Sequence, residues 1–188
     1  QVALALSPGV SADECEAFTL VFEQLADTEL IGVGARLGHV DGPGGGHHID
    51  ALFDEVEHPD IVLVPGGLGC AQTACDEQFL AWLRAVAPRC QWMAASSTGT
   101  VVVAAAGLLG ERDAATHWLA SALLESYGST ASRERIVEVG NIITCEGQIT
   151  VRRTHLVHER VERQMQTISR RSGTAQSFGR TGNRQRAR

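Results

Sequence analysis

Strand-like and helix-like segments alternate along this chain of 188 residues, which predicts an α/β fold with a doubly wound, mostly parallel sheet and helices on both faces. Two observations carry the prediction. Short apolar runs at residues 2–6 and 61–64 have the length of buried strands. The segments between such runs carry apolar residues at helical spacing. We therefore expect three layers, α/β/α.

The first helix is expected to begin at Ser11, directly after the Ser-Pro-Gly turn that ends the first strand. Ser11 and Glu14 have the spacing of a capping box, in which each side chain bonds a main-chain N–H of the other's residue. Apolar residues then recur every three or four positions and predict the buried stripe of the helix, which consists of Cys15, Phe18, Phe22 and Leu25.

Five further strands and two further helices follow from the same rules. Strands are predicted at residues 30–35, 61–64 and 92–95, and two short strands flank Gly140-Asn141 within 136–145. Helices are predicted at 76–86, with Phe79, Leu83 and Val86 inside, and after Cys145, with Val157, Val161 and Ile168 inside. Residues 42–46, rich in glycine, are expected to form a loop.

Composition limits what the chain does. Its 44% of hydrophobic residues can build one good core, so we expect one domain at residues 1–169. All sixteen cations are arginine, and six of them fall in residues 170–188, which we expect to be a basic, disordered tail. The net charge of -6 gives no overall attraction to nucleic acid or to a membrane surface. We therefore expect neither a membrane partner nor a specific nucleic-acid partner.

Two further patterns bear on compartment and cofactors. No signal-peptide pattern opens the chain, no apolar run is long enough to span a membrane, and the five scattered cysteines form no C-x-x-C pair, so we expect a cytoplasmic protein with reduced thiols. Metal-competent side chains gather around residues 39–50, but a flexible Gly-rich loop does not hold ligands in place. No metal site and no cofactor is predicted.

The candidate site centres on residues 92–107, which read as a buried strand, a very tight turn and a helix of small residues. Ala95, Ser97 and Gly99 form a small-x-Ser-x-Gly pattern, in which small neighbours let strand and helix meet at a sharp angle. Ser97 lies at the apex of this turn. We expect it to face a pocket.

Four blocks in order give the chain a resemblance to the DJ-1/PfpI (ThiJ) superfamily, relatives of class I glutamine amidotransferases. They are the strand and acidic helix start at 2–16, the run Asp60-Ile-Val-Leu-Val-Pro-Gly-Gly67, the Ser97 turn, and Gly107-Leu-Leu-Gly110 with Ala115-Thr-His-Trp118. The last block is most similar to the branch of isocyanide hydratases and the ligand-binding halves of AraC-type regulators. The resemblance implies a flavodoxin-like fold and a homodimer.

The resemblance also implies the roles of several residues. An acidic residue near the first helix start points at the nucleophile, and Glu16 is the best match, with Asp13 as a rival. The nucleophile itself is usually a Cys, where this chain has Ser97. Because an alcohol is far less acidic than a thiol, Ser97 needs a base, and Glu16 or His117 is expected to move its proton. Main-chain N–H groups at the turn residues Gly66, Gly67 and Thr98 would hold the developing anion.

Two functions follow from these residues. The first is a hydrolase or hydratase, similar to isonitrile hydratases or amidases, that acts on a small carbon-nitrogen or carbonyl electrophile. The second is a non-catalytic module that binds a small metabolite, like the sensing half of an AraC-type regulator. The serine at position 97 favours the second function. The absence of a helix-turn-helix pattern after residue 168 favours the first.

Overall fold

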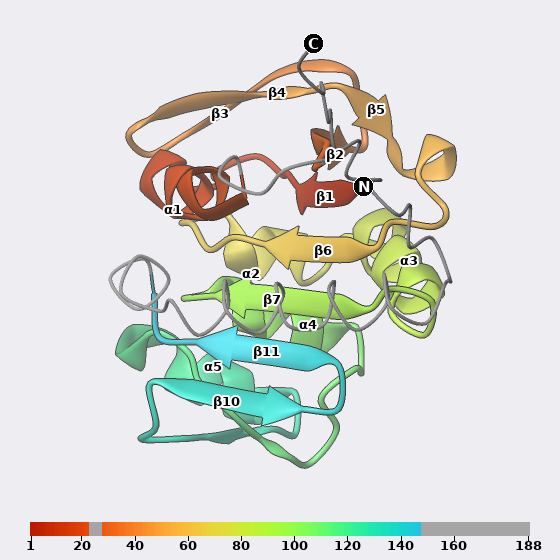
Figure 1. The fold of residues 1–188 in the computed structure, drawn as a ribbon. Coiled ribbons are helices and arrows are strands. Elements are labelled where there is room, and N and C mark those ends of the chain that lie inside the picture. The colour runs from red at the N-terminus through yellow and green to blue at the C-terminus, as the bar shows by residue number, and fades with distance from the viewer. Residues whose placement is uncertain (23–27, 148–188) are drawn as a thin grey trace, which may run out of the picture. The chain divides into compact units, whose positions relative to one another are not determined.

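Seven strands form one central sheet in the computed structural model, which describes residues 1–22 and 28–147. Their order is β10-β11-β7-β6-β1-β2-β5, from the bottom to the top of Figure 1. All neighbours in this sheet are parallel except β10 and β11. The strands are β1 (Val2–Ala5), β2 (Leu30–Gly34), β5 (Ala51–Leu52), β6 (Ile61–Val64), β7 (Trp92–Ser96), β10 (Ile136–Val139) and β11 (Ile142–Cys145). The predicted mostly parallel sheet is confirmed.

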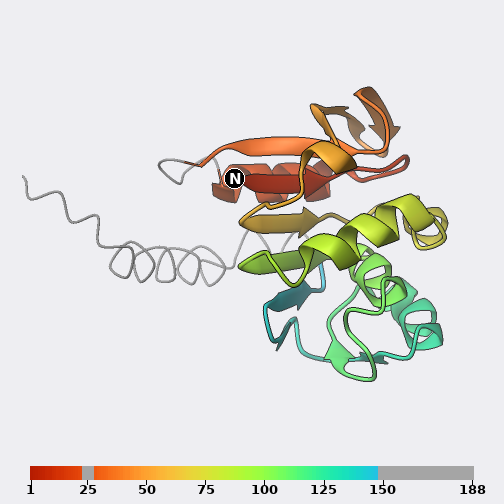
Figure 2. The ribbon, with the colours of Figure 1, turned by 90° about the vertical axis from the view of Figure 1, so that its right-hand side faces the viewer.

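Helices follow the strands as the alternation predicts. They are α1 (Ala12–Phe22), α2 (Cys70–Thr73), α3 (Glu77–Val86), α4 (Gly99–Ala105) and α5 (Ser121–Ser126), with 3-10 turns η1 (Phe53–Glu55) and η2 (Trp118–Ala120). Figure 2 shows α3, α4 and α5 gathered on the same side of the strands. The Asp76 side chain caps α3 by accepting hydrogen bonds from the N–H groups of Gln78 and Phe79, at 3.0 and 3.3 Å.

The sheet has apolar residues on both of its faces, as a doubly wound fold requires. On β6, Val62 joins the core that includes Leu83 of α3 and Leu124 of α5. Successive side chains of a strand point to opposite faces of the sheet, so Leu63 lies on the other face from Val62. Leu63 is also fully buried. In α1, Phe18 is also buried. Burial on both faces explains why the strands read as continuous apolar runs in the sequence.

One prediction was wrong: the Gly-rich segment is a hairpin, made of β3 (Gly38–Gly42) and β4 (Gly45–Ile49). It docks on the start of α1, where the Ala12 N–H donates to the Pro43 carbonyl at 2.9 Å. Gly42 packs so closely that a Cβ there would lie 1.7 Å from the Val10 carbonyl oxygen. Glycine at this position therefore serves a close approach of two main chains and not a flexible loop.

A second small sheet pairs β8 (Asp113–Ala114) with β9 (Thr130–Ala131). The predicted helix after Cys145 and the predicted tail at 170–188 lie outside the described residues, as does Leu25 of the first helix stripe. Among the helices that the structure describes, none is both long enough and apolar enough to cross a membrane.

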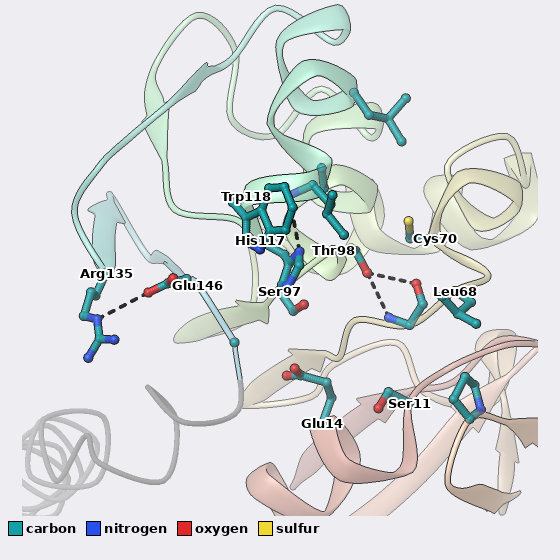
Figure 3. Close-up of a pocket in the computed structure, with 16 residues that line it drawn as sticks. Ser11, Glu14, Leu68, Cys70, Ser97, Thr98, His117, Trp118, Arg135 and Glu146 are labelled. Carbon is teal, nitrogen blue, oxygen red and sulfur yellow. Dashed lines mark hydrogen bonds and ion pairs between the residues drawn. The ribbon is translucent and has the colours of Figure 1, made fainter.

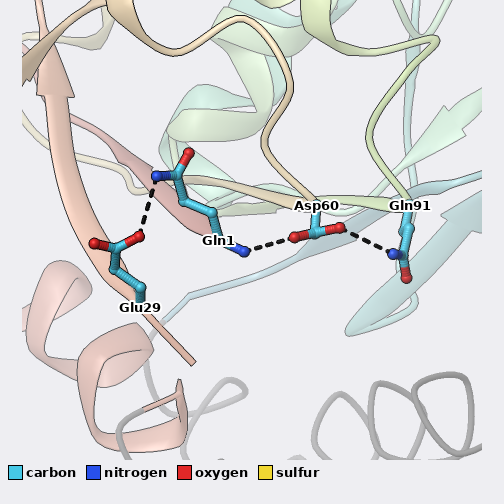
Figure 4. Close-up of polar contacts among 4 residues, drawn as sticks. All are labelled: Gln1, Glu29, Asp60 and Gln91. Carbon is cyan, nitrogen blue, oxygen red and sulfur yellow. Dashed lines mark hydrogen bonds and ion pairs between the residues drawn. The ribbon is translucent and has the colours of Figure 1, made fainter. Parts of the chain in front are cut away.

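Polar contacts tie the amino ends of the strands together, at the edge of the sheet away from the carboxyl ends (Figure 4). The Asp60 carboxylate, just before β6, pairs with the amino group of Gln1 and accepts a hydrogen bond from the Gln91 side chain at 3.2 Å. The Gln1 side chain donates in turn to Glu29 at 3.2 Å. This edge is engaged in structural contacts, and the carboxyl edge carries the residues with candidate chemistry.

Candidate functional site

A pocket of about 660 Å³ lies where the parallel strands β1, β6, β7 and β11 end. Each strand leads into a segment that lines it: Glu14 follows β1, Gly67 follows β6, Ser97 follows β7 and Gly147 follows β11. Figure 3 shows Glu14, Ser97 and His117 approaching the pocket from separate elements. The carboxyl edge of the strands is where open α/β sheets bind ligands.

Ser97 occupies the tight turn between β7 and α4 that the sequence predicts. Its φ is 55°, and among the described residues no other non-glycine residue has a positive φ. Such a conformation costs on the order of 1–3 kcal/mol and persists where the surroundings enforce it. Gly66 packs directly beneath, since a Cβ on it would lie 2.8 Å from the Ser97 Cβ. The side chain of Ser97 reaches the pocket although only 8% of the residue is exposed.

Two hydrogen bonds hold the Ser97 main chain in this conformation. Its N–H donates to the Cys145 carbonyl at 2.8 Å, which extends the β7–β11 ladder. Its carbonyl accepts a hydrogen bond from the buried Thr116 hydroxyl, also at 2.8 Å. Both main-chain polar groups of Ser97 are therefore engaged, and the side-chain hydroxyl is the group that it presents to the pocket.

The carboxylate at the pocket is Glu14 and not Glu16. Glu14 lines the pocket with 8% of its surface exposed, whereas Glu16 and Asp13 are exposed on α1 and do not line it. Two residues along a helix turn the side chain by about 200°, so Glu14 and Glu16 point in nearly opposite directions. Glu14 Oε1 and Ser97 Oγ lie 3.4 and 4.0 Å from the point where a Cβ on Gly147 would be. The two groups therefore share one small region.

The predicted anion-holding residues are brought together, with one difference. Gly67 and Thr98 line the pocket, and Gly66 lies behind Ser97 instead. The Thr98 hydroxyl accepts from the Gly67 N–H and donates to the Gly67 carbonyl, both at 2.9 Å, so the predicted Gly67 donor is already engaged. Within the described ranges, the N–H groups of Leu68 and Thr98 have no hydrogen-bond acceptor. These two groups are therefore main-chain donors that a ligand in the pocket can use.

His117 lines the pocket, is half-buried, and directly precedes the turn η2 in the chain. Its Nδ1 accepts a hydrogen bond from the Leu119 N–H at 3.3 Å, and its ring lies 5.8 Å from the Trp118 ring, centroid to centroid. An Nδ1 that accepts carries no proton, so the neutral ring has its proton on Nε2. In this arrangement His117 offers the pocket a donor and not a base.

Three buried thiols, of which Cys15 and Cys145 lie near Glu14, are poorly suited to act as nucleophiles. Burial, and next the charge of Glu14, raise the pKa of Cys145 to about 12, and the same two causes raise the pKa of Cys15 to about 12. Burial raises the pKa of Cys90 to about 11. Because the thiolate is the reactive form, these thiols do not replace Ser97.

Sequence reasoning missed the rim of the pocket. Leu68, Trp118 and Leu119 line it and are 86%, 71% and 69% exposed, which makes an apolar rim around the opening. The Arg135 guanidinium pairs with Glu146 at 3.3 Å on another wall. These five residues lie beside predicted turns or strand ends, but nothing in the sequence indicates that they face the pocket. In the part of the chain that the structure describes, no cluster of three metal-ligating side chains occurs.

Residues 1–157 match the model of the DJ-1/PfpI family. Isonitrile hydratase from Pseudomonas putida is 36% identical over 95 residues, which cover 50% of this chain and 42% of that protein. This chain therefore matches less than half the length of that relative.

Solved structures of the same kind share the fold. A ThiJ/PfpI family protein from Pseudomonas syringae superposes with a TM-score of 0.79 at 22% identity, over 97% of this chain and 78% of that one. A ThiJ/PfpI domain protein from Brachyspira murdochii gives 0.76 at 22% identity, over 87% and 95%. Schizosaccharomyces pombe DJ-1 gives 0.73 at 18% identity, over 93% and 98%. At these identities the likeness establishes the α/β fold alone.

Proposed function

This chain belongs to the DJ-1/PfpI family, and from that premise we propose that it is a hydrolase or hydratase acting on a small carbon-nitrogen or carbonyl electrophile, with Ser97 as its nucleophile. One observation carries the proposal. A serine held at φ 55° and a largely buried carboxylate, Glu14, face the same pocket. A strained conformation and a buried acid beside a hydroxyl are features that gather at active sites.

Glu14 is the proton acceptor in this proposal. Ser97 Oγ bonds the electrophilic carbon while its proton passes to the Glu14 carboxylate. His117 takes the opposite role, since its Nδ1 is engaged by the Leu119 N–H and Nε2 carries the proton. A donor at Nε2 can hydrogen-bond to a departing group and stabilise the charge that develops on it, while the proton comes from Glu14. The N–H groups of Leu68 and Thr98 stabilise the oxygen or nitrogen that gains negative charge.

We also propose that the protein is a homodimer that buries the apolar rim. Leu68, Trp118 and Leu119 all line the pocket and are all exposed, and exposed apolar side chains of this kind are typical of an interaction site. A second chain over the rim would close the pocket to bulk water. The small-molecule substrate would then react in a site of lower dielectric constant, where each donor acts more strongly.

The test is a turnover screen of the purified protein with isocyanides, amides, small esters and α-oxoaldehydes. Ser97→Ala is expected to abolish turnover, and Glu14→Gln to lower kcat by roughly 10²- to 10⁴-fold, the usual contribution of a general base. Glu16→Gln is the matched control, because Glu16 lies on the same helix and is exposed. Equal losses in the two glutamine variants would contradict the role of Glu14.

A second candidate function is a non-catalytic sensor related to the ligand-binding half of AraC-type regulators. It is favoured by the two hydrogen bonds between the Thr98 hydroxyl and the Gly67 main chain. Because the Thr98 hydroxyl already satisfies the Gly67 N–H, one donor expected of an active site is engaged. A sensor would be stabilised against heat by a ligand without turning it over. Stabilisation that persists in Ser97→Ala, together with activity that first appears in Ser97→Cys, would establish this second function.

A further inference from the structure

We infer that the substrate of this site is an uncharged carboxylic ester or lactone, cleaved through an acyl group carried on Ser97. The inference rests on the proposed function and names its substrate class. It follows from three features of the pocket: the type of nucleophile, the placement of the free main-chain donors, and the charges of the lining residues.

The nucleophile favours an acyl carbon. A serine oxygen is a hard, weakly acidic nucleophile, and it attacks the polarised carbon of a carbonyl group more readily than the soft carbon of an isocyanide. A thiolate would suit the soft carbon better, but Cys15 and Cys145 have pKa values raised to about 12 and stay protonated at neutral pH. A thiolate is therefore not supplied by Cys15 or Cys145, and Cys70 lines the pocket from α2 and not from the tight turn. The tight turn presents Ser97, which shares the pocket with the Glu14 carboxylate.

The free donors match an acyl intermediate. When Ser97 Oγ adds to a carbonyl carbon, the negative charge forms on the carbonyl oxygen, and two N–H groups are the usual means of holding it. Within residues 1–22 and 28–147, the N–H groups of Leu68 and Thr98 are hydrogen-bonded to nothing, and both residues line the pocket. An isocyanide carbon bears no oxygen at the moment of attack, so the same donors would have no acceptor to stabilise.

The charges of the pocket favour a neutral substrate. Glu14 and Glu146 are both acidic lining residues, and the one arginine among the described lining residues, Arg135, is paired with Glu146 at 3.3 Å. A substrate carboxylate would face two carboxylates and would have to compete for one guanidinium. The pocket is also lined by the apolar side chains of Leu119 and Leu123, which fit an alkyl or aryl chain.

The reaction balances with water as the only co-substrate. The Ser97 Oγ–carbon bond forms as the Ser97 proton moves to Glu14, and the ester carbon–oxygen bond breaks as the protonated Glu14 gives that proton to the departing alcohol oxygen, to which His117 Nε2–H donates a hydrogen bond. Water then attacks the acyl carbon, Glu14 accepts a proton of the water, and Ser97 Oγ recovers its own. One ester and one water become one acid and one alcohol.

The experiment compares p-nitrophenyl acetate, butyrate and octanoate with tert-butyl isocyanide, using the full chain, and follows both product release and intact mass. The expected result is a burst of one p-nitrophenolate per chain, a mass gain of one acyl group on the Ser97 peptide, and no reaction with the isocyanide. Ser97→Ala should remove the burst and lower ester turnover by roughly 10³-fold or more. Ser126→Ala is the matched control, because Ser126 is exposed on α5 and bonds only the Leu123 carbonyl.

Each outcome separates the inference from the proposed function. Isocyanide turnover that needs Ser97, without ester turnover, would overturn the inference and leave the proposed function standing. Ester turnover that survives in Ser97→Ala would overturn both, since serine would not be the nucleophile. No reaction with either substrate, and no acyl group on Ser97, would also overturn both and favour the sensor.

Discussion

Thr116→Val isolates the bond that holds the Ser97 turn. Threonine and valine have nearly the same shape, so the change removes the hydroxyl that donates to the Ser97 carbonyl at 2.8 Å and little else. Because Thr116 is 7% exposed, water cannot easily replace that donor. A buried carbonyl left without a donor costs about 1–3 kcal/mol, and we expect the free energy of unfolding to fall by that amount.

The same change should weaken Ser97 as a nucleophile. Without the Thr116 hydroxyl, the turn at φ 55° is free to relax toward a less strained conformation and to move Oγ away from Glu14. A displacement of 1 Å at a reacting group can cost on the order of 10²-fold in rate. The rate is measured as covalent labelling of Ser97 by phenylmethylsulfonyl fluoride, which reports on the serine without requiring knowledge of the substrate.

Two control variants make this prediction refutable. Thr116→Ser keeps the hydroxyl and should restore most of the labelling rate. Thr100→Val removes an equally buried bond, from Thr100 to the Ala115 carbonyl at 2.8 Å, and should lower stability with a much smaller effect on labelling. If Thr116→Val lost stability in urea unfolding but labelled Ser97 at the normal rate, Thr116 would be a structural residue only, and the reasoning about the turn would be wrong.

Three other outcomes can be measured directly. In the unfolded chain the thiols of Cys15, Cys90 and Cys145 ionise near pH 9, whereas in the folded protein their pKa values are about 12, 11 and 12. The unfolded state therefore loses these protons first, and the free energy of unfolding, measured in urea, should fall as the pH rises from about 9 toward 11. Alanine at the three positions should reduce that slope. Gly67→Ala would put a Cβ 2.2 Å from a main-chain oxygen of the opposite loop, and a thermal melt should show a loss of about 1–3 kcal/mol. Leu119→Glu places a charge on the apolar rim and should convert the proposed dimer to a monomer in sedimentation, whereas an unchanged mass would contradict the proposed interface.

The parts of the fold that the sequence predicts are those with a strong local signal. The run that became β6 is apolar throughout because both of its faces are covered, and Asp76 stands where the cap of α3 is needed. The hairpin of β3 and β4 had no such signal. Glycine and histidine are weak strand formers, and the hairpin is held instead by its docking on residues 9–12, which lie far away in the sequence.

The acid beside Ser97 shows a different limit, because its signal was present in the sequence. With about 100° per residue, the stripe of Cys15, Phe18 and Phe22 has a centre from which Glu14 lies about 70° away and Glu16 about 130° away. Glu14 therefore borders the buried face, and Glu16 lies toward solvent. The capping-box pattern already explains a glutamate at position 14 as a helix-start residue, so the pattern does not indicate its proposed role as a proton acceptor. A residue at the border of a buried stripe, one turn into a helix that follows a parallel strand, is directed at the carboxyl edge of the sheet, where Ser97 also lies.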